Sequence, residues 1–230
     1  MAVTMSHRFD QDKRTLRAAL RSGRHGALDY LVCRFTCDCR AYASWSKFRH
    51  EMADPLMIEG AVHHLDLLAD LAGAPCDTLY AQTWNPAWGA YAGDSQGLVT
   101  MRLENGVRVQ YEGAKTNAVG LNCWTDEYIR AECERATLVL DRRELVCYPH
   151  DPEGSWRNIK GVASQPIPLL DQPKWMNAWL IEQFVQWLDG GPPMETNVYD
   201  NLQSVAMVTA AIQSSRTGQP VKVQALLDGK

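Results

Sequence analysis

The chain has 230 residues, of which 46% are apolar, 22% charged and 9% aromatic, a composition that excludes a disordered or low-complexity protein. A chain of this length buries roughly 70% of the surface that its unfolded form exposes, so we expect one domain over residues 1–230. The 23 basic and 27 acidic residues leave a net charge of −4. This balance lacks the basic excess that is typical of nucleic-acid-binding proteins.

Membrane and secretion signals are missing from the sequence. It has no run of 18 apolar residues, and residues 1–24 carry charges throughout, unlike a signal peptide. The seven cysteines are odd in number, so we expect reduced thiols in a cytoplasmic protein rather than a disulfide framework. Cys33, Cys37 and Cys39 share one face of a predicted strand with Leu31 and Phe35, and we interpret them as core side chains.

Helical and strand periodicities follow one another along the chain. They predict helices over 10–22, 56–72, 173–188 and 196–217. They predict strands over 31–40, 78–84, 98–103, 107–112, 128–133, 137–140, 145–148 and 221–223, and an irregular surface stretch over 149–173. Asn105-Gly106 is a strong hairpin signal. The pattern predicts an α+β fold, in which an open, mostly antiparallel sheet has helices packed on one face.

The other face of the predicted sheet is polar. It carries Arg102, Arg108, Gln110, Glu112, Arg130, Glu132 and Glu134. Such a face is either solvated or packed against another sheet, and the pattern alone leaves both alternatives open.

The helix predicted over 56–72 carries a narrow polar stripe. Glu59, His63, Asp66 and Asp70 fall within about 60° of its circumference, and most of the remainder is apolar. We therefore expect a buried helix whose stripe faces a cleft. A neutral histidine accepts a proton near neutral pH, and a carboxylate one turn away orients the ring. The stripe also fits a structural histidine. Because three metal ligands on one helix converge poorly, no metal site is assigned.

The tryptophans fall into two groups. Trp175, Trp179 and Trp187 lie on a predicted helix and are interpreted as core residues. The other group lies in or beside predicted loops, where an indole ring either packs internally or stacks on the apolar face of a sugar, and consists of Trp45, Trp84, Trp88 and Trp124.

Four segments, in order, resemble the Gfo/Idh/MocA family of oxidoreductases. Residues 57–73 are similar to the D-x-G-x-H-x-x-D helix of that family, and the other segments are 6–26, 105–111 and 214–221. The resemblance implies the C-terminal α+β domain, which family members carry after a Rossmann domain that binds NAD(H) or NADP(H). This sequence has no Gly-x-Gly pair and no E-K-P motif with its catalytic lysine. NAD(P) is therefore implied by the resemblance alone, and cofactor-binding residues are unassigned.

The resemblance also implies roles for individual residues. His63 matches the catalytic histidine, which exchanges a proton with a substrate hydroxyl as hydride moves to or from nicotinamide. Glu59 stands where the family has Asp, and Ala61 where it has Gly. Asp66 matches the second Asp and is interpreted as a support for the site. Weaker candidates for contacting a sugar are Arg8, Trp45, Arg49, His64, Asn85 and Trp124.

The leading hypothesis is the substrate-binding and oligomerisation domain of an oxidoreductase that interconverts alcohol and ketone groups of a sugar or polyol. The missing Rossmann domain would belong to a longer product or to a separate polypeptide, and the polar sheet face would form a homo-oligomer. Two alternatives stay open. One is a non-catalytic sugar-binding or assembly module, and the other is a cofactor-free lyase or isomerase that uses Glu59 and His63.

Overall fold

The computed structural model describes residues 1–154 and 163–228, which form an open nine-stranded sheet covered by helices. The strands are β1 (Leu28–Thr36), β2 (Cys76–Trp84), β3 (Gln96–Leu103), β4 (Arg108–Ala114), β5 (Tyr128–Cys133), β6 (Ala136–Asp141), β7 (Glu144–Pro149), β8 (Gln165–Pro166) and β9 (Val221–Lys222). The helices are η1 (Ser6–Phe9), α1 (Gln11–Arg21), α2 (Lys47–Glu51), η2 (Leu56–Ala61), α3 (Val62–Ala72), α4 (Met176–Leu188), α5 (Val198–Thr217) and α6 (Val223–Leu227).

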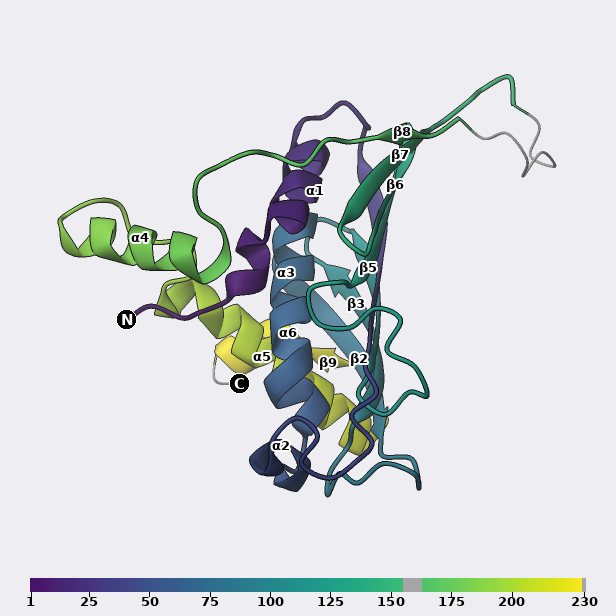
Figure 1. The fold of residues 1–230 in the computed structure, drawn as a ribbon, viewed down its shortest axis with the longest axis vertical. Helices are drawn as coiled ribbons and strands as arrows, with labels where there is room; N and C mark the ends of the chain where they lie inside the picture. The colour runs from purple at the N-terminus through teal and green to yellow at the C-terminus, as the bar shows by residue number, and fades with distance from the viewer. Residues whose placement is uncertain (155–162, 229–230) are drawn as a thin grey trace.

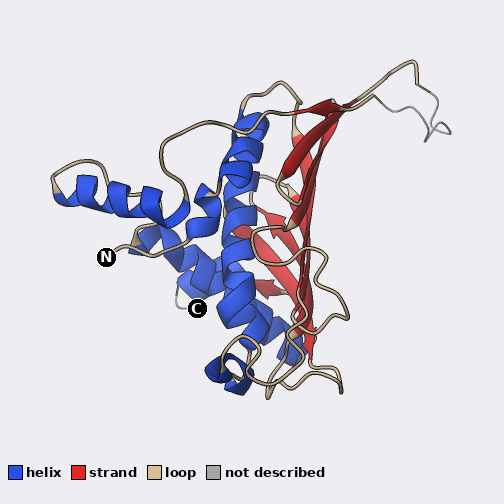
Figure 2. Ribbon diagram, in the orientation of Figure 1, coloured by secondary structure: helices blue, strands red, loops and turns tan. Residues whose placement is uncertain are grey.

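The strand order is β8-β7-β6-β5-β1-β4-β3-β2-β9. Neighbouring strands run antiparallel except β1 and β4, which run parallel in the centre of the sheet. The helices lie on one side of the sheet and leave the other side uncovered (Figures 1 and 2). The predicted α+β architecture is thus confirmed.

Local signals set the ends of the long helices. The Asp10 carboxylate accepts a hydrogen bond from the Gln11 N–H at the start of α1, and Asn197 caps the first turn of α5 in the same way. Helices α3 and α5 end at Gly73 and Gly218, whose φ values of 72° and 67° suit glycine. These termini agree with the predicted helices to within a few residues.

The core fills the space between the sheet and helices α1, α3 and α5. Phe35 on β1, Tyr111 on β4, Leu65 and Leu68 on α3 and Met207 on α5 are fully buried in one cluster. Because the inner face of the sheet takes every second residue of each strand, the alternation seen in the sequence translates directly into this packing.

The helix predicted over 56–72 differs from a uniform α-helix in its first six residues. Segment η2 is π-helical, and the Val62 N–H at its end reaches the Met57 carbonyl five residues back. The wider turn rotates side chains away from the positions that an α-helical wheel gives them. Ile58 is therefore 46% exposed, although the apolar part of this helix was expected to be buried, whereas His64 is fully buried.

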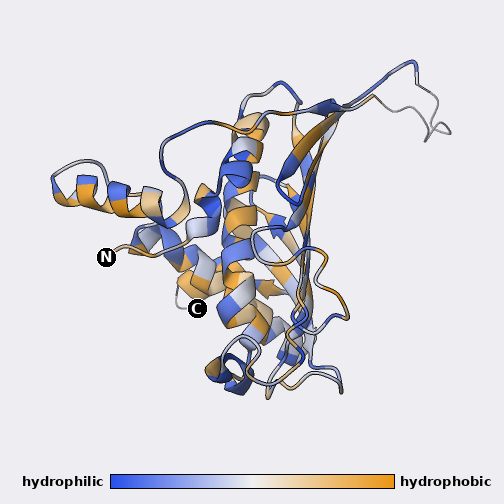
Figure 3. Ribbon diagram, viewed as in Figure 1, coloured by the Kyte–Doolittle hydropathy of each residue, from blue (hydrophilic) through white to orange (hydrophobic). Residues whose placement is uncertain are grey.

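Helix α4 corrects the prediction that its tryptophans are core residues. It projects from the body of the molecule with apolar side chains along its length (Figures 1 and 3). Leu180 alone among the described residues of α4 is buried, against Phe9 and Met194, and Trp175, Trp179 and Trp187 are half-buried. The apolar spacing predicts a helix but does not say whether anything packs on it.

Two further predictions concern the irregular stretch before α4 and the absence of a membrane-spanning segment. Residues 155–162 of the predicted irregular stretch over 149–173 lie outside the described residues, and β8 in its remainder pairs with β7. Within 1–154 and 163–228, no helix combines the length and hydropathy needed to span a membrane.

The prediction of reduced thiols is wrong for two cysteines. Cys37 follows β1 and forms a disulfide with Cys123, which lies 86 residues later in the loop between β4 and β5. An isolated bridge between Thr36 and Asn122 brings this loop against the end of β1 and places the two Cα atoms 5.0 Å apart. The other five cysteines are free, and Cys33 is buried as predicted.

We predict that the Cys37→Ser/Cys123→Ser variant loses about 2–4 kcal/mol of unfolding free energy, because the cross-link restricts the unfolded chain over a long loop. Urea denaturation followed by tryptophan fluorescence measures the loss. Cys133→Ser, which removes a free half-buried thiol, is the matched control. Equal stability of the double variant and the control would contradict a stabilising disulfide.

Candidate functional site

Glu59, the first residue of the predicted stripe, is bound by one cation from helix α2 and one from the β4–β5 loop. Glu59 accepts hydrogen bonds from Lys115 Nζ and from Arg49 Nε, the latter at 2.7 Å. Burial raises the pKa of Glu59, but the bonds and charges of Lys115 and Arg49 outweigh it and lower the pKa below its ordinary value. Trp45 stacks with both cations, each about 5.0 Å from its ring centroid. Glu59 is therefore held as a carboxylate.

Asp66 does not face a cleft, contrary to the prediction from the helical wheel. Its two oxygens bind Arg8 Nε at 2.6 Å and Arg8 Nη2 at 2.7 Å, and Ser204 Oγ donates to Oδ1 at 2.5 Å. Arg8 also lies 3.1 Å from Asp200 on α5. Asp66 and Arg8 are both buried, so this bidentate pair joins η1, α3 and α5.

Asp70, the last residue of the stripe, pairs with two arginines of α1. Its carboxylate lies 3.3 Å from Arg17 Nε and 3.2 Å from Arg21 Nη2. It lines a shallow cavity of about 350 Å³ between α3 and α5, together with Arg8 and Asp200. The stripe is thus a row of ion pairs, with the histidine between them.

His63 is half-buried, and its Nδ1 atom is buried without a hydrogen-bond partner among the described residues. Its ring lies 5.2 Å from that of Trp124 and 5.6 Å from that of His7. Burial, with smaller effects of His7 and His64, lowers the pKa of His63 to about 4. No hydrogen bond joins His63 to Glu59 or Asp66 in the described chain, so the expected orienting carboxylate is absent from this arrangement.

The neighbouring His64 belongs to a separate buried cluster. Its Nε2 lies 3.2 Å from Glu127 Oε1 and its Nδ1 lies 3.0 Å from the Tyr111 hydroxyl. His7 Nε2 reaches the same Glu127 oxygen at 3.0 Å, and Lys13 Nζ lies 2.8 Å from Oε2. Burial raises the pKa of Glu127, but these partners lower it well below its ordinary range. His64 is fully enclosed and does not line an open sugar site.

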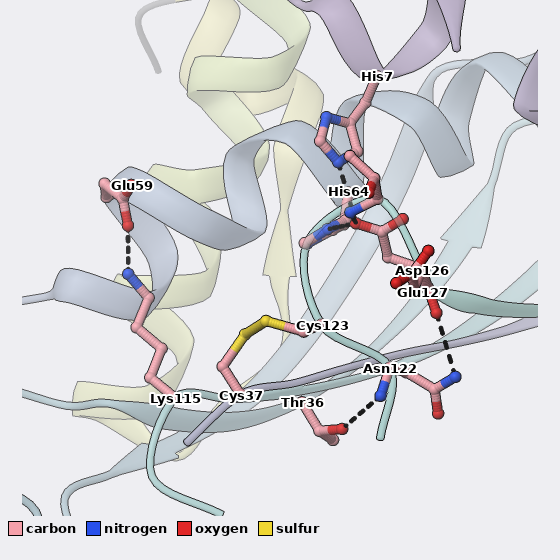
Figure 4. Close-up of a disulfide and its surroundings, with 11 residues drawn as sticks. His7, Thr36, Cys37, Glu59, His64, Lys115, Asn122, Cys123, Asp126 and Glu127 are labelled. Carbon is pink, nitrogen blue, oxygen red and sulfur yellow. Dashed lines mark hydrogen bonds and ion pairs between the residues drawn. A yellow bond between two sulfur atoms is a disulfide. The ribbon is translucent and has the colours of Figure 1, made fainter. Parts of the chain in front are cut away.

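The loop between β4 and β5, residues 115–127, supplies side chains that contact both Glu59 and the histidines. It carries Lys115, Trp124 and Glu127, and the Cys37–Cys123 disulfide fastens it to the end of β1. Figure 4 shows the Glu59–Lys115 pair on one side of the disulfide and the His7, His64 and Glu127 side chains on the other. One loop therefore positions groups on both sides.

The remaining sugar-site candidates separate in space. Trp45 and Trp124 lie together, with ring centroids 5.9 Å apart, and Arg49 stacks on Trp45. Asn85 instead bonds the Tyr91 carbonyl at 2.8 Å and accepts from Ser95 Oγ at 2.7 Å, so it holds the β2–β3 connection. The structure thus brings His63, Trp124, Trp45, Arg49 and Glu59 together and leaves Asn85 apart.

Several groups of the site were not found from the sequence. They are His7, Lys13, Tyr111, Lys115 and Glu127. His7 adjoins Arg8 in a segment that carries the family resemblance, but nothing in the spacing connects it with residues 57 and 120 positions away.

Sequence comparison identifies the domain type. The profile described as the oxidoreductase family, C-terminal alpha/beta domain (Gfo/Idh/MocA), matches residues 17–223. An uncharacterized protein, y4oX, of Sinorhizobium fredii is 54% identical over 227 residues. The match covers 99% of this chain and 63% of that protein, so the chain spans less than two thirds of its length.

Solved structures with the same fold share little sequence with this chain. An Agrobacterium radiobacter oxidoreductase in complex with NAD+, L-tartaric acid and magnesium is 18% identical, with a TM-score of 0.77 over 98% of this chain and 65% of that one. The Caulobacter crescentus aldose-aldose oxidoreductase complexed with glycerol is 14% identical, also at 0.77, over 96% and 63%. The Bordetella pertussis WlbA dehydrogenase with NADH and UDP-GlcNAcA is 18% identical at 0.72, over 96% and 62%.

We predict that Arg8→Met lowers the unfolding free energy by about 3–5 kcal/mol, because it leaves the Asp66 carboxylate buried without its cation. The control Arg216→Met breaks the exposed pair with Asp54 and costs at most about 1 kcal/mol. Chemical denaturation of the three proteins measures both effects. Similar losses in the two variants would show that the buried pair does not anchor η1.

We predict a pH-dependent contribution from Glu59. Because its pKa is lowered in the folded state, the carboxylate stabilises the fold above the ordinary value of 4.5 and loses this effect as the pH falls through the folded pKa. The stability difference between the native chain and Glu59→Gln should thus be larger at about pH 7 than at about pH 4. Glu104→Gln, in the exposed β3–β4 turn, is the control. A difference that does not change with pH would refute the assignment.

Proposed function

Because the chain belongs to the Gfo/Idh/MocA oxidoreductase family, as its C-terminal α/β domain, we propose that it is the substrate-binding and oligomerisation part of an NAD(P)-dependent oxidoreductase acting on a sugar or polyol. One observation carries the proposal. His63, at the position of the family's catalytic histidine, has an Nδ1 atom that is buried without a hydrogen-bond partner in residues 1–154 and 163–228, and its pKa of about 4 keeps the ring neutral. A neutral imidazole can accept a proton from a hydroxyl group.

The substrate would bind against the aromatic and cationic side chains that surround His63. Trp124 and Trp45 present indole rings that can stack on the apolar face of a sugar, and the Arg49 and Lys115 cations lie on Trp45. The glycerol, L-tartaric acid and UDP-GlcNAcA named with the similar structures are all rich in hydroxyl groups.

The proton step uses residues of this chain. His63 accepts the proton of the reacting hydroxyl in the oxidation direction and returns it in the reverse direction. Glu59 is fixed by Lys115 and Arg49, and this fixed ion cluster holds the η2–α3 junction from which His63 projects. Trp124, in edge contact with the ring, excludes water from one side of it.

The residues of this chain do not fit a dinucleotide. The sequence lacks the glycine turn, and the first turns of α1 and α5 carry the carboxylates Asp12 and Asp200, which oppose a bound pyrophosphate. We place NAD(P) on a Rossmann-type unit, in the same product or in a separate polypeptide. The exposed apolar side chains Ile181, Val185 and Leu188 of α4 give such a unit a surface to contact.

The uncovered sheet face would contact a second copy of the chain. It carries a depression of about 750 Å³ lined by aromatic, aliphatic and basic side chains, among them Tyr30, Tyr80 and Arg102. A sheet face without covering helices buries its side chains most readily against another sheet, which favours face-to-face pairing.

We predict that the chain alone does not bind NADH or NADPH, and that catalysis needs a nucleotide-binding unit. A chimera that joins this chain to the remaining part of the Sinorhizobium protein should reduce NAD(P)+ with members of a polyol and aldose panel. His63→Ala should lower kcat by about 10²- to 10⁴-fold, as loss of a general acid–base group does. NAD(P)H absorbance measures the rate.

His25→Gln, which changes a histidine in the turn between α1 and β1, is the control for that experiment and should leave kcat unchanged. Full turnover by the His63→Ala chimera would refute the role of His63. Turnover by the chain without any nicotinamide would favour acid–base chemistry of the lyase or isomerase type instead.

A further inference from the structure

We propose that His7, His64 and Glu127 form a binding site for a divalent transition-metal ion, with Zn²⁺ as its best fit. The three residues come from η1, α3 and the β4–β5 loop and are all fully buried. One donor atom of each lies within 4.8 Å of the other two. Figure 4 shows the three side chains turned toward one another. Ligands from separate elements can surround an ion, which ligands on a single helix cannot do.

The distances suit a tetrahedral ion. Ligand bonds of about 2.0 Å place two ligand atoms of a tetrahedron roughly 3.3 Å apart. Glu127 Oε1 lies 3.0 Å from His7 Nε2 and 3.2 Å from His64 Nε2. The ligand atoms of the two histidines lie within 4.8 Å of each other, so an approach of at most about 1.5 Å completes the third edge. Three protein ligands then leave the fourth position for water.

The hydrogen bonding is overcrowded without an ion. Glu127 Oε1 would accept from both imidazole Nε2–H groups and also from the Thr125 N–H at 2.9 Å, three donors for an oxygen with two lone pairs. An ion bound by both Nε2 atoms and Oε1 replaces the two imidazole donors and removes the excess.

The surrounding groups orient the ligands. The Tyr111 hydroxyl lies 3.0 Å from His64 Nδ1 and can accept a hydrogen bond from Nδ1–H, which leaves the Nε2 lone pair for the metal. Lys13 Nζ lies 2.8 Å from Glu127 Oε2 and turns Oε1 toward the histidines. Trp124 covers His7 at a centroid distance of 4.3 Å. The ligand set is thus held in place before an ion binds.

The charged groups around Glu127 also favour binding of a cation, even with the charge of Lys13 counted. The carboxylates of Asp10, Asp12 and Glu127 face the two cations Lys13 and Arg143, through contacts of 3.0 Å or less except the 3.8 Å from Lys13 to Asp10. Within this set three carboxylates share two cations, so a bound cation would lie among more acidic than basic groups. A set of two imidazoles and one carboxylate suits Zn²⁺ better than Mg²⁺ or Ca²⁺, which prefer oxygen ligands alone.

The test is metal binding by the whole chain after dialysis against a chelator. We expect one equivalent of Zn²⁺ by mass spectrometry of the metal, a raised melting temperature, and with Co²⁺ the visible spectrum of a tetrahedral nitrogen- and oxygen-bound ion. A sulfur-to-cobalt charge-transfer band would assign the metal to cysteines and overturn the proposal. So would the absence of stoichiometric binding by the native chain.

Variants locate the site. Glu127→Gln and His7→Asn should weaken binding by more than 100-fold, and Tyr111→Phe, which keeps the ring in the core, by about 10- to 100-fold. The control His25→Gln should bind as the native chain does. Circular dichroism shows whether each variant is folded, and folded His7→Asn or Tyr111→Phe protein with native affinity would overturn the assignment. The test reads metal content and does not depend on the proposed oxidoreductase activity.

Discussion

The polar side of the η2–α3 helix lies against the body of the protein, and each charge on it requires a partner from elsewhere in the chain. A buried carboxylate without a cation costs several kcal/mol, so the fold is constrained to bring such partners in. Arg8 reaches Asp66 across 58 residues, and Lys115 reaches Glu59 across 56. These long-range pairs fix η1, the β4–β5 loop and α5 around one helix. They also decide which of its side chains remain free for chemistry.

The β4–β5 loop shows how a segment without regular structure is made rigid. It crosses the end of β1, where Thr36 pairs with Asn122 and Cys37 is linked to Cys123. Trp124 directly follows the disulfide, so its ring position against His63 depends on this anchor. Ordering this 13-residue loop costs conformational entropy, roughly 1–2 kcal/mol of free energy for the backbone of each residue. The disulfide and the Thr36–Asn122 pairing help to offset that cost.

The sheet could be predicted from the sequence because its signals are local. The alternation of Leu31, Cys33 and Phe35 and the Asn105-Gly106 turn need no knowledge of distant residues. From the sequence, the family resemblance led to His63 and Glu59 on one helix and to Trp45, Arg49 and Trp124, which the structure places beside them. Glu127 and Lys115 gave no signal, since a single charged residue in a loop has no periodicity. The exposure of α4 was not predicted for a related reason. The spacing of apolar residues predicts that a helix has an apolar face, but it does not predict which part of the protein packs against that face.

The choice between two adjacent histidines depends on the π-helical turn. Side chains on an α-helix are separated by about 100° per residue, so His63 and His64 cannot both face the core. The wide turn at 56–61 sets the phase in which His64 enters the Tyr111–Glu127 cluster and His63 remains at its edge beside Trp124. Insertions of this kind are frequent at functional sites. A one-residue change of phase would exchange the two rings, bury His63 in place of His64 and break the row of ion pairs. The irregular turn is therefore needed for this arrangement of side chains and is not a defect of the helix.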